Sequence, residues 1–124
     1  MHFTEHELTT AVNAAAKYVV AARRKDVRKG RTSADDVWAE LDRHERYKVL
    51  KAVGSQVLPV LAALPEVEVA EGERPTFTQG EIIAAVSQSL DEGAGGRMRR
   101  KVVLAGRVAI VKAALGQLPP RGRR

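Results

Sequence analysis

Three histidines, His2, His6 and His44, carry the side chains best suited to acid–base chemistry or metal binding near neutral pH. His2 and His6 are four residues apart, but His2 precedes a predicted helix start, so the pair should not share a helical face. Glu40 and His44 have the same spacing, and a helix-capping signal at Asp42 separates them. The chain has no cysteine, and no predicted strand precedes a serine. We therefore predict no catalytic residue, metal site or cofactor, and a protein that is not an enzyme.

The glycine-rich segment GAGGR, residues 93–97, precedes a predicted helix, and this arrangement can cradle a phosphate group. It lacks the Lys-Ser/Thr pair of a nucleotide-binding loop, and no predicted strand leads into it. A turn between two helices explains the segment, and a nucleotide site is the alternative.

The strongest chemical signal is a separation of charge along the chain. Residues 97–124 carry nine Lys or Arg and no Asp or Glu, whereas residues 33–96 carry five positive and twelve negative side chains. Four of the cations fall in the first turns of the last predicted helix, where the helix dipole disfavours positive charge. Either Asp91 and Glu92 neutralise them, or an external anion binds there. These four cations are Arg97, Arg99, Arg100 and Lys101.

Arginine suits contacts to phosphate, so the first partner we predict is nucleic acid, bound through its backbone without strong sequence specificity. Trp38 and Tyr47 lie at helical spacing with aliphatic residues and are expected in the core, which leaves no aromatic side chain to stack on bases. The alternative is an oligomeric assembly or adaptor subunit, for example a phage structural or regulatory component, whose basic end docks on an acidic protein surface. The predicted anion-binding residues are Arg97, Arg99, Arg100, Lys101, Arg28, Lys29, Arg31, Arg121, Arg123 and Arg124.

The elements that must position these side chains are helices. Thr4 with Glu7 and Thr78 with Glu81 have the spacing of capping boxes, and Asp42 with Glu45 gives a similar signal. Gly54 and Pro59 predict a kink or a break within their helix, and Gly30 predicts a left-handed turn. We expect helices over about 4–26, 33–41, 43–64, 78–90 and 97–117, an acidic linker over 65–76 and a flexible basic tail over 119–124.

The fold class that follows is all-α, with about five helices in one domain over residues 1–118. Aromatic residues are only 4% of the chain, so the core must be aliphatic, which favours packing of helix on helix. FTEHELTTAV at 3–12 resembles FTQGEIIAAV at 77–86, and RYKVLKA at 46–52 resembles RRKVVLA at 99–105. These similarities indicate two related helical hairpins packed together, or simply similar helix starts. The last helix is apolar on nearly every side, which predicts that it is buried among the others.

The polar start of the chain does not have the pattern of a signal peptide, and no apolar stretch is long enough to span a bilayer. We therefore expect a cytoplasmic protein without a membrane partner. The many Ala and Arg residues indicate a high-GC genome, such as that of an actinobacterium or one of its phages.

Overall fold

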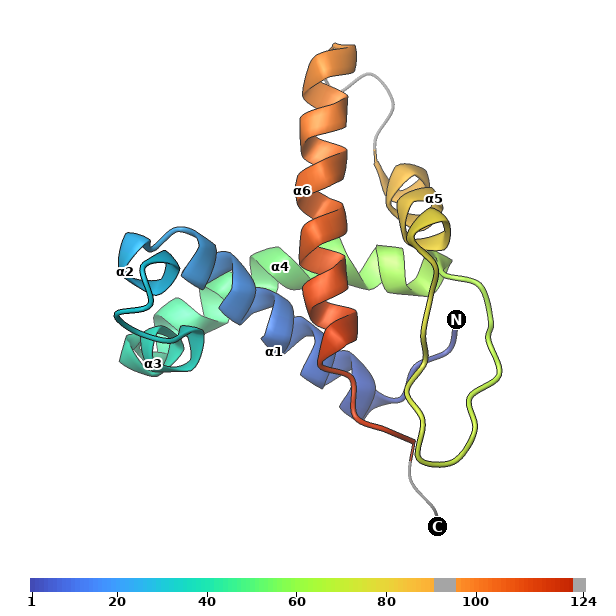
Figure 1. Ribbon diagram of the computed structural model, residues 1–124, viewed down its shortest axis with the longest axis horizontal. Coiled ribbons are helices and arrows are strands. Elements are labelled where there is room, and N and C mark those ends of the chain that lie inside the picture. The colour runs from blue at the N-terminus through green and yellow to red at the C-terminus, as the bar shows by residue number, and fades with distance from the viewer. Residues whose placement is uncertain (91–95, 122–124) are drawn as a thin grey trace.

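The computed structural model describes residues 1–90 and 96–121, except for the side chain of Arg97. These residues form six helices and no strand, so the predicted all-α fold is confirmed. The short helix α2, which overlaps the predicted end of the first helix, adds a sixth helix to the five expected. Figure 1 shows their arrangement. The helices are α1 (Glu5–Ala22), α2 (Lys25–Arg28), α3 (Ala34–Glu40), α4 (Arg43–Ala63), α5 (Gln79–Ser89) and α6 (Arg97–Gly116).

Three of the four long helices begin with the capping boxes that the sequence predicts. In α1, the Thr4 hydroxyl accepts a hydrogen bond from the Glu7 amide at 3.1 Å, and the Glu7 carboxylate accepts one from the Thr4 amide at 2.9 Å. The same reciprocal pair starts α4 and α5. Each box satisfies amide groups that a helix start leaves unpaired. The exception is α6, which begins after Gly96 without a side-chain cap.

Two helix boundaries differ from the sequence prediction. α1 ends at Ala22 rather than near residue 26, and the chain turns through α2 to Gly30, whose φ of 75° confirms the left-handed turn. α4 continues through Gly54 and Pro59, so of the predicted kink or break the break is wrong and the kink stays a prediction. The proline ring removes a single backbone N–H donor, so the hydrogen bonds of the neighbouring turns keep the helix continuous. Pro59 is also exposed, so its ring does not disturb the core.

The core lies where α1 and α5 each pack against both α4 and α6. Its buried residues are aliphatic, as predicted. Three pairs of buried residues are each 54 positions apart along the chain. These pairs are Val57 and Val111, Val60 and Ala114, and Leu64 and Leu118. The rings of Phe3 and Phe77, which precede α1 and α5, contact each other with centroids 6.3 Å apart. This repeated burial pattern supports the hypothesis of two related hairpins.

The ends of α4 and α6 are also covered in equivalent ways. The amino-terminal ammonium of Met1 donates to the Ala62 carbonyl at 3.4 Å, and the Arg74 guanidinium donates to the Gly116 carbonyl at 3.2 Å. A cation therefore interacts with the negative end of each helix dipole, at carbonyls that are again 54 positions apart. The two hairpins share terminal contacts as well as core positions.

α6 is buried over its second half only, so the prediction of a helix buried among the others holds for that half. Val108, Val111 and Ala114 lie in the core, but Met98 is 80% exposed and Val102 is 72% exposed. The first half of the helix projects beyond the other helices (Figure 1). Leu104, nearer the middle of the helix, is partly buried against the core. No helix within residues 1–90 and 96–121 is long and apolar enough to cross a membrane.

Candidate nucleic-acid interface

The projecting start of α6 differs electrostatically from the start of every other long helix. α1, α4 and α5 each have a glutamate in the first turn, whereas α6 has no acidic residue there. Arg99 and Lys101 are exposed, and no carboxylate of the described residues lies within 4.0 Å of either side chain. Positive side chains thus meet the positive end of the helix dipole, so this end of α6 concentrates positive potential.

Not all of the predicted cations of this segment can be assigned to that site. Arg100 is half-buried and has an interaction of its own, so we do not include it among the available cations. The side chain of Arg97 lies outside the described residues, as do Asp91 and Glu92. Neutralisation by these two acids therefore stays a prediction.

Helix geometry places Arg99 and Lys101 on different faces of α6. Successive residues are rotated by about 100°, so these two side chains point about 200° apart. Gln117 lines a groove beside α1. It is 18 residues, or about five turns, from Arg99, so the two side chains lie on the same face. Lys101 instead lines a groove beside α5. The segment that the sequence presents as one cluster is divided between two surfaces.

The second group of predicted cations lies at the far end of α1, around α2. Arg28, Lys29 and Arg31 are exposed there, next to the turn at Gly30. Arg28 also donates to the Ala22 carbonyl at 3.2 Å, which fixes its position at the end of α1. Within the described residues, none of these three cations has a carboxylate within 4.0 Å. The structure thus brings these three predicted residues together.

Two further cations, Arg23 and Lys25, belong to this group. Arg23 is the C-cap residue of α1, and Lys25 is the first residue of α2. Both side chains are exposed. Arg24, in contrast, pairs with Asp26 at 2.7 Å and Glu40 at 3.7 Å, and Asp26 has a lowered pKa because of the hydrogen bond from Arg24. We call Arg23, Lys25, Arg28, Lys29 and Arg31 the α2 cluster.

Arg121 is held inside the molecule and is not part of either cationic group. Its guanidinium donates to both carboxylate oxygens of Glu7, at 3.1 and 3.2 Å, and Glu7 is only 3% exposed. Burial raises the pKa of Glu7, but the bonds from Arg121 and Thr4 outweigh it and hold the pKa below its ordinary value.

The main chain of Arg121 bonds to the acidic linker as well. Its carbonyl accepts a hydrogen bond from the Gly72 amide at 2.6 Å, and its amide donates to Glu73 at 2.8 Å. The segment predicted to be a loose tail from residue 119 is thus ordered through Arg121, and this arginine is removed from the predicted anion-binding set. Arg123 and Arg124 lie outside the described residues.

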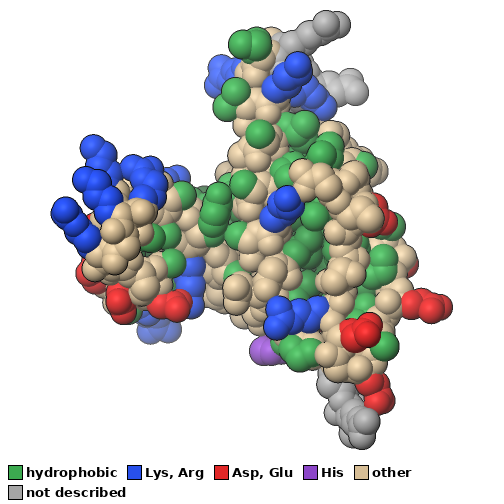
Figure 2. All heavy atoms as spheres, in the orientation of Figure 1, with side chains coloured by type: hydrophobic (Ala, Val, Ile, Leu, Met, Phe, Trp, Pro, Cys, Tyr) green, Lys and Arg blue, Asp and Glu red, His purple; other side chains and the backbone are tan. Residues whose placement is uncertain are grey.

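The available cations occupy two projecting parts of the same face. In Figure 2, Lys and Arg side chains gather at the end of the arm formed by α1, α2 and α3 and at the projecting end of α6. Many of the acidic side chains in this view lie along the opposite edge. Acidic side chains also lie on the arm, beside its cations, so the two signs of charge are only partly separated in space (Figure 2).

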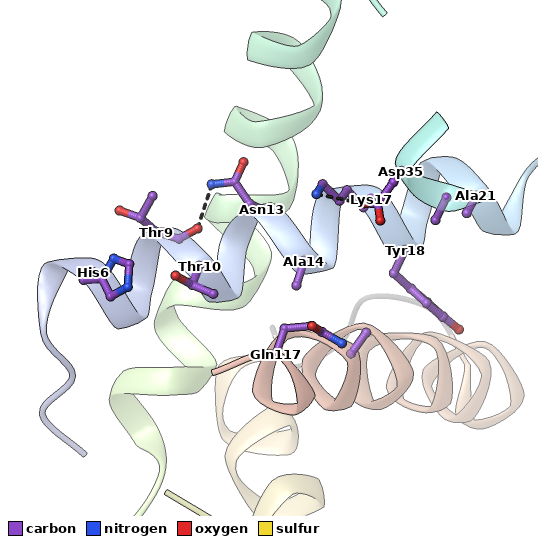
Figure 3. A pocket seen from close by; sticks show the side chains of 12 residues that line it. His6, Thr9, Thr10, Asn13, Ala14, Lys17, Tyr18, Ala21, Asp35 and Gln117 are labelled. Carbon is purple, nitrogen blue, oxygen red and sulfur yellow. Dashed lines mark hydrogen bonds and ion pairs between the residues drawn. The ribbon is translucent and has the colours of Figure 1, made fainter. Parts of the chain in front are cut away.

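A groove of about 610 Å³ lies between α1 and α6, close to where the two projecting parts meet. Figure 3 shows polar side chains of α1 along it, with Gln117 on the α6 side. Lys17 pairs with Asp35 at 2.9 Å, which joins α1 to α3 at one end of the groove. Tyr18 also lines it and is 40% exposed, an aromatic side chain that sequence reasoning did not select.

The other large aromatic residues give a mixed outcome. Trp38 is half-buried and packs against the core, as predicted. Tyr47 was expected in the core but is 60% exposed, because it lies on the side of α4 that no other helix covers. The sequence argument that no exposed aromatic residue remains is therefore wrong.

The described residues offer little to an alternative chemical site. No group of three His, Asp or Glu side chains within residues 1–90 and 96–121 could hold a metal ion. His2 is 2.8 Å from Glu66 across the surface, and this contact accounts for the lowered pKa of Glu66. His6 lines the groove beside α1 without a second histidine among its lining residues.

Comparison of the chain with protein-family models, curated proteins and solved structures gives no match in any of the three searches.

Proposed function

We propose that the protein binds nucleic acid through the phosphate backbone, without strong sequence specificity, using Arg99 and the α2 cluster. The observation that carries this proposal is the start of α6, where exposed cations surround an uncapped helix start and no acidic residue occupies the first turn. Such an arrangement costs local stability in the isolated protein. An anion bound there removes that cost.

The two cationic groups suit a long polyanion better than a small one. They lie on separate projecting parts of one face, with a groove between α1 and α6 near their junction (Figure 2). A phosphate backbone offers regularly spaced charges that can reach both groups. Contacts of this kind fix position on a duplex and do not read its sequence.

The test is a titration of a fluorescent random-sequence duplex, followed by anisotropy, between about 50 and 200 mM salt. The logarithm of affinity should fall linearly with the logarithm of salt concentration. In the triple variant Arg28→Ala, Lys29→Ala, Arg31→Ala, the slope should decrease by about 1 for each cation that no longer binds a phosphate. The matched control is Arg43→Ala, Lys48→Ala, Lys51→Ala, which removes three exposed cations from α4. Absence of binding at low salt, or an equal decrease in the control, would refute the proposal.

The second candidate function is an adaptor or assembly subunit that docks on acidic protein. The specific observation in its favour is the exposure of Met98 and Val102 beside the cations of α6. Phosphate binding does not need these apolar side chains, whereas a protein interface does. A protein that binds no duplex at low salt but forms a defined complex with an acidic protein would fit this candidate.

A further inference from the structure

A second groove, of about 390 Å³, runs between α5 and α6 on a different face of α6 from Arg99. From α6 it is lined by residues with the spacing i, i+3, i+4, i+7, i+8 and i+11, which is one continuous stripe of a helix. α5 contributes Gln79 and Ile83. The residues from α6 are Lys101, Leu104, Ala105, Val108, Ala109 and Lys112.

The stripe has the features of a seam to which a further helix can pack. Ala105 and Ala109 are one turn apart and small, so another backbone can approach closely there, and Leu104 and Val108 provide larger apolar contacts. Met98 and Val102 extend the exposed apolar surface towards the end of α6. Apolar side chains clustered on a projecting helix indicate an interaction surface.

Charge determines which helix fits this seam. The charged residues that line the groove are both lysines, Lys101 and Lys112, one at each end of the stripe. They are 11 residues apart on one helix, which is a separation of about 16 Å. Glu81, the acidic residue of α5, is already used in the capping box with Thr78. A partner with carboxylates about three turns apart, on either side of an apolar stripe, would match both lysines.

A second copy of the chain is a poor match for the same groove. α6 carries six Lys or Arg and no acidic residue, so pairing of two α6 helices would bring like charges together. The apolar stripes of α1, α4 and α5 contribute to the core and are not available to a neighbour.

We infer that the α5–α6 groove binds an amphipathic helix of another protein, one that carries acidic residues about 11 positions apart on either side of an apolar stripe. This interaction goes beyond the proposed nucleic-acid contact and uses a different face of α6. It follows the helix-in-groove mode, in which apolar side chains supply affinity and flanking charges supply register.

The test uses the full chain and a labelled synthetic helix of about 20 residues, with leucines along one face and glutamates 11 positions apart. We expect saturable binding by anisotropy, and weaker binding of a peptide with lysines in place of the glutamates. The double variant Lys101→Glu, Lys112→Glu should lose affinity for the acidic peptide by about tenfold or more and gain affinity for the basic one. The control Lys48→Glu, Lys51→Glu makes the same change in net charge on α4 and should leave peptide binding within about twofold of the original.

Ala105→Trp fills the groove without a change in charge and should abolish peptide binding. All the substituted side chains lie outside the buried core, so each variant is expected to fold. Circular dichroism and thermal unfolding of each variant check that it does. Equal binding of the two peptides, binding that survives Ala105→Trp, or no binding would overturn the inference. Concentration-dependent self-association that Ala105→Trp abolishes would identify a second copy as the occupant instead. Duplex DNA that competes with the peptide would assign this groove to phosphate binding.

Discussion

Replacement of Arg121 by alanine tests the claim that this residue is structural and not part of the anion-binding surface. Its guanidinium makes two hydrogen bonds to the buried carboxylate of Glu7 and a third, at 3.3 Å, to the His2 carbonyl. The substitution removes all three and leaves Glu7 with its bond from the Thr4 amide. The main-chain bonds of residue 121 to the linker can remain.

The expected loss follows from the burial of the two partners. Removal of one member of a fully buried ion pair costs about 3 to 5 kcal/mol, because the other charge is left without a partner. The Arg121 side chain is 34% exposed, so water can reach Glu7 once the guanidinium is gone. We therefore expect a loss of about 2 kcal/mol in the free energy of unfolding. For a domain of this size that corresponds to a decrease of about 8 °C in the melting temperature.

The assay is urea and thermal unfolding followed by circular dichroism, with Arg74→Ala as the matched control. Arg74 also donates to a carbonyl but is exposed, so its loss should cost less than about 1 kcal/mol. In a double-mutant cycle with Glu7→Gln, the coupling energy should be at least about 1 kcal/mol. The reasoning is refuted if Arg121→Ala is no more destabilising than Arg74→Ala, or if it decreases the salt slope of DNA binding.

The same ion pair gives the stability a defined dependence on pH. The folded pKa of Glu7 lies below its ordinary value of 4.5, so on acidification the unfolded chain takes up the proton first. The contribution of the pair is therefore present above about pH 4.5 and is lost as pH falls through the folded pKa. The difference in stability between the original protein and Arg121→Ala should decrease over that range. A difference that stays constant would show that Glu7 is not the group involved.

Two further predictions concern the internal repeat and the start of α6. Val57→Ala and Val111→Ala each remove fully buried methyl groups and should each cost about 2 kcal/mol in the free energy of unfolding, measured in urea. The two costs should be similar if the positions are equivalent in two related hairpins, and a difference of more than about 1 kcal/mol would contradict that equivalence. Gly96→Asp supplies the missing cap and a negative charge, so it should stabilise the protein by about 0.5 to 1 kcal/mol and weaken duplex binding; unchanged binding would separate Gly96 from the interface.

The sequence predicts helix starts well because a capping box is a local interaction. Thr4 and Glu7 are three residues apart, and no distant residue is needed to form the pair. The turn at Gly30 is local for the same reason. The buried positions that the two halves share are 54 residues apart, whereas the similar segments RYKVLKA and RRKVVLA are 53 apart, so this similarity does not give the register of the shared burial.

The surface is harder to predict because it depends on contacts between distant residues. Arg121 is 114 positions from Glu7, and nothing near either residue indicates that they pair. The exposure of Val102 depends on where α5 ends relative to α6, which the apolar composition of α6 does not reveal. The division of Arg99 and Lys101 between two faces was available from helix periodicity alone.

α6 is anchored at one end only, and this has a consequence for how the protein can change. Substitutions of Met98 and Val102 in its projecting half change exposed side chains and leave the packing of Val111 and Ala114 intact. The exposed tip and the packed core are thus supplied by different turns of a single helix. The charge and polarity of the tip can therefore change while the core stays constant.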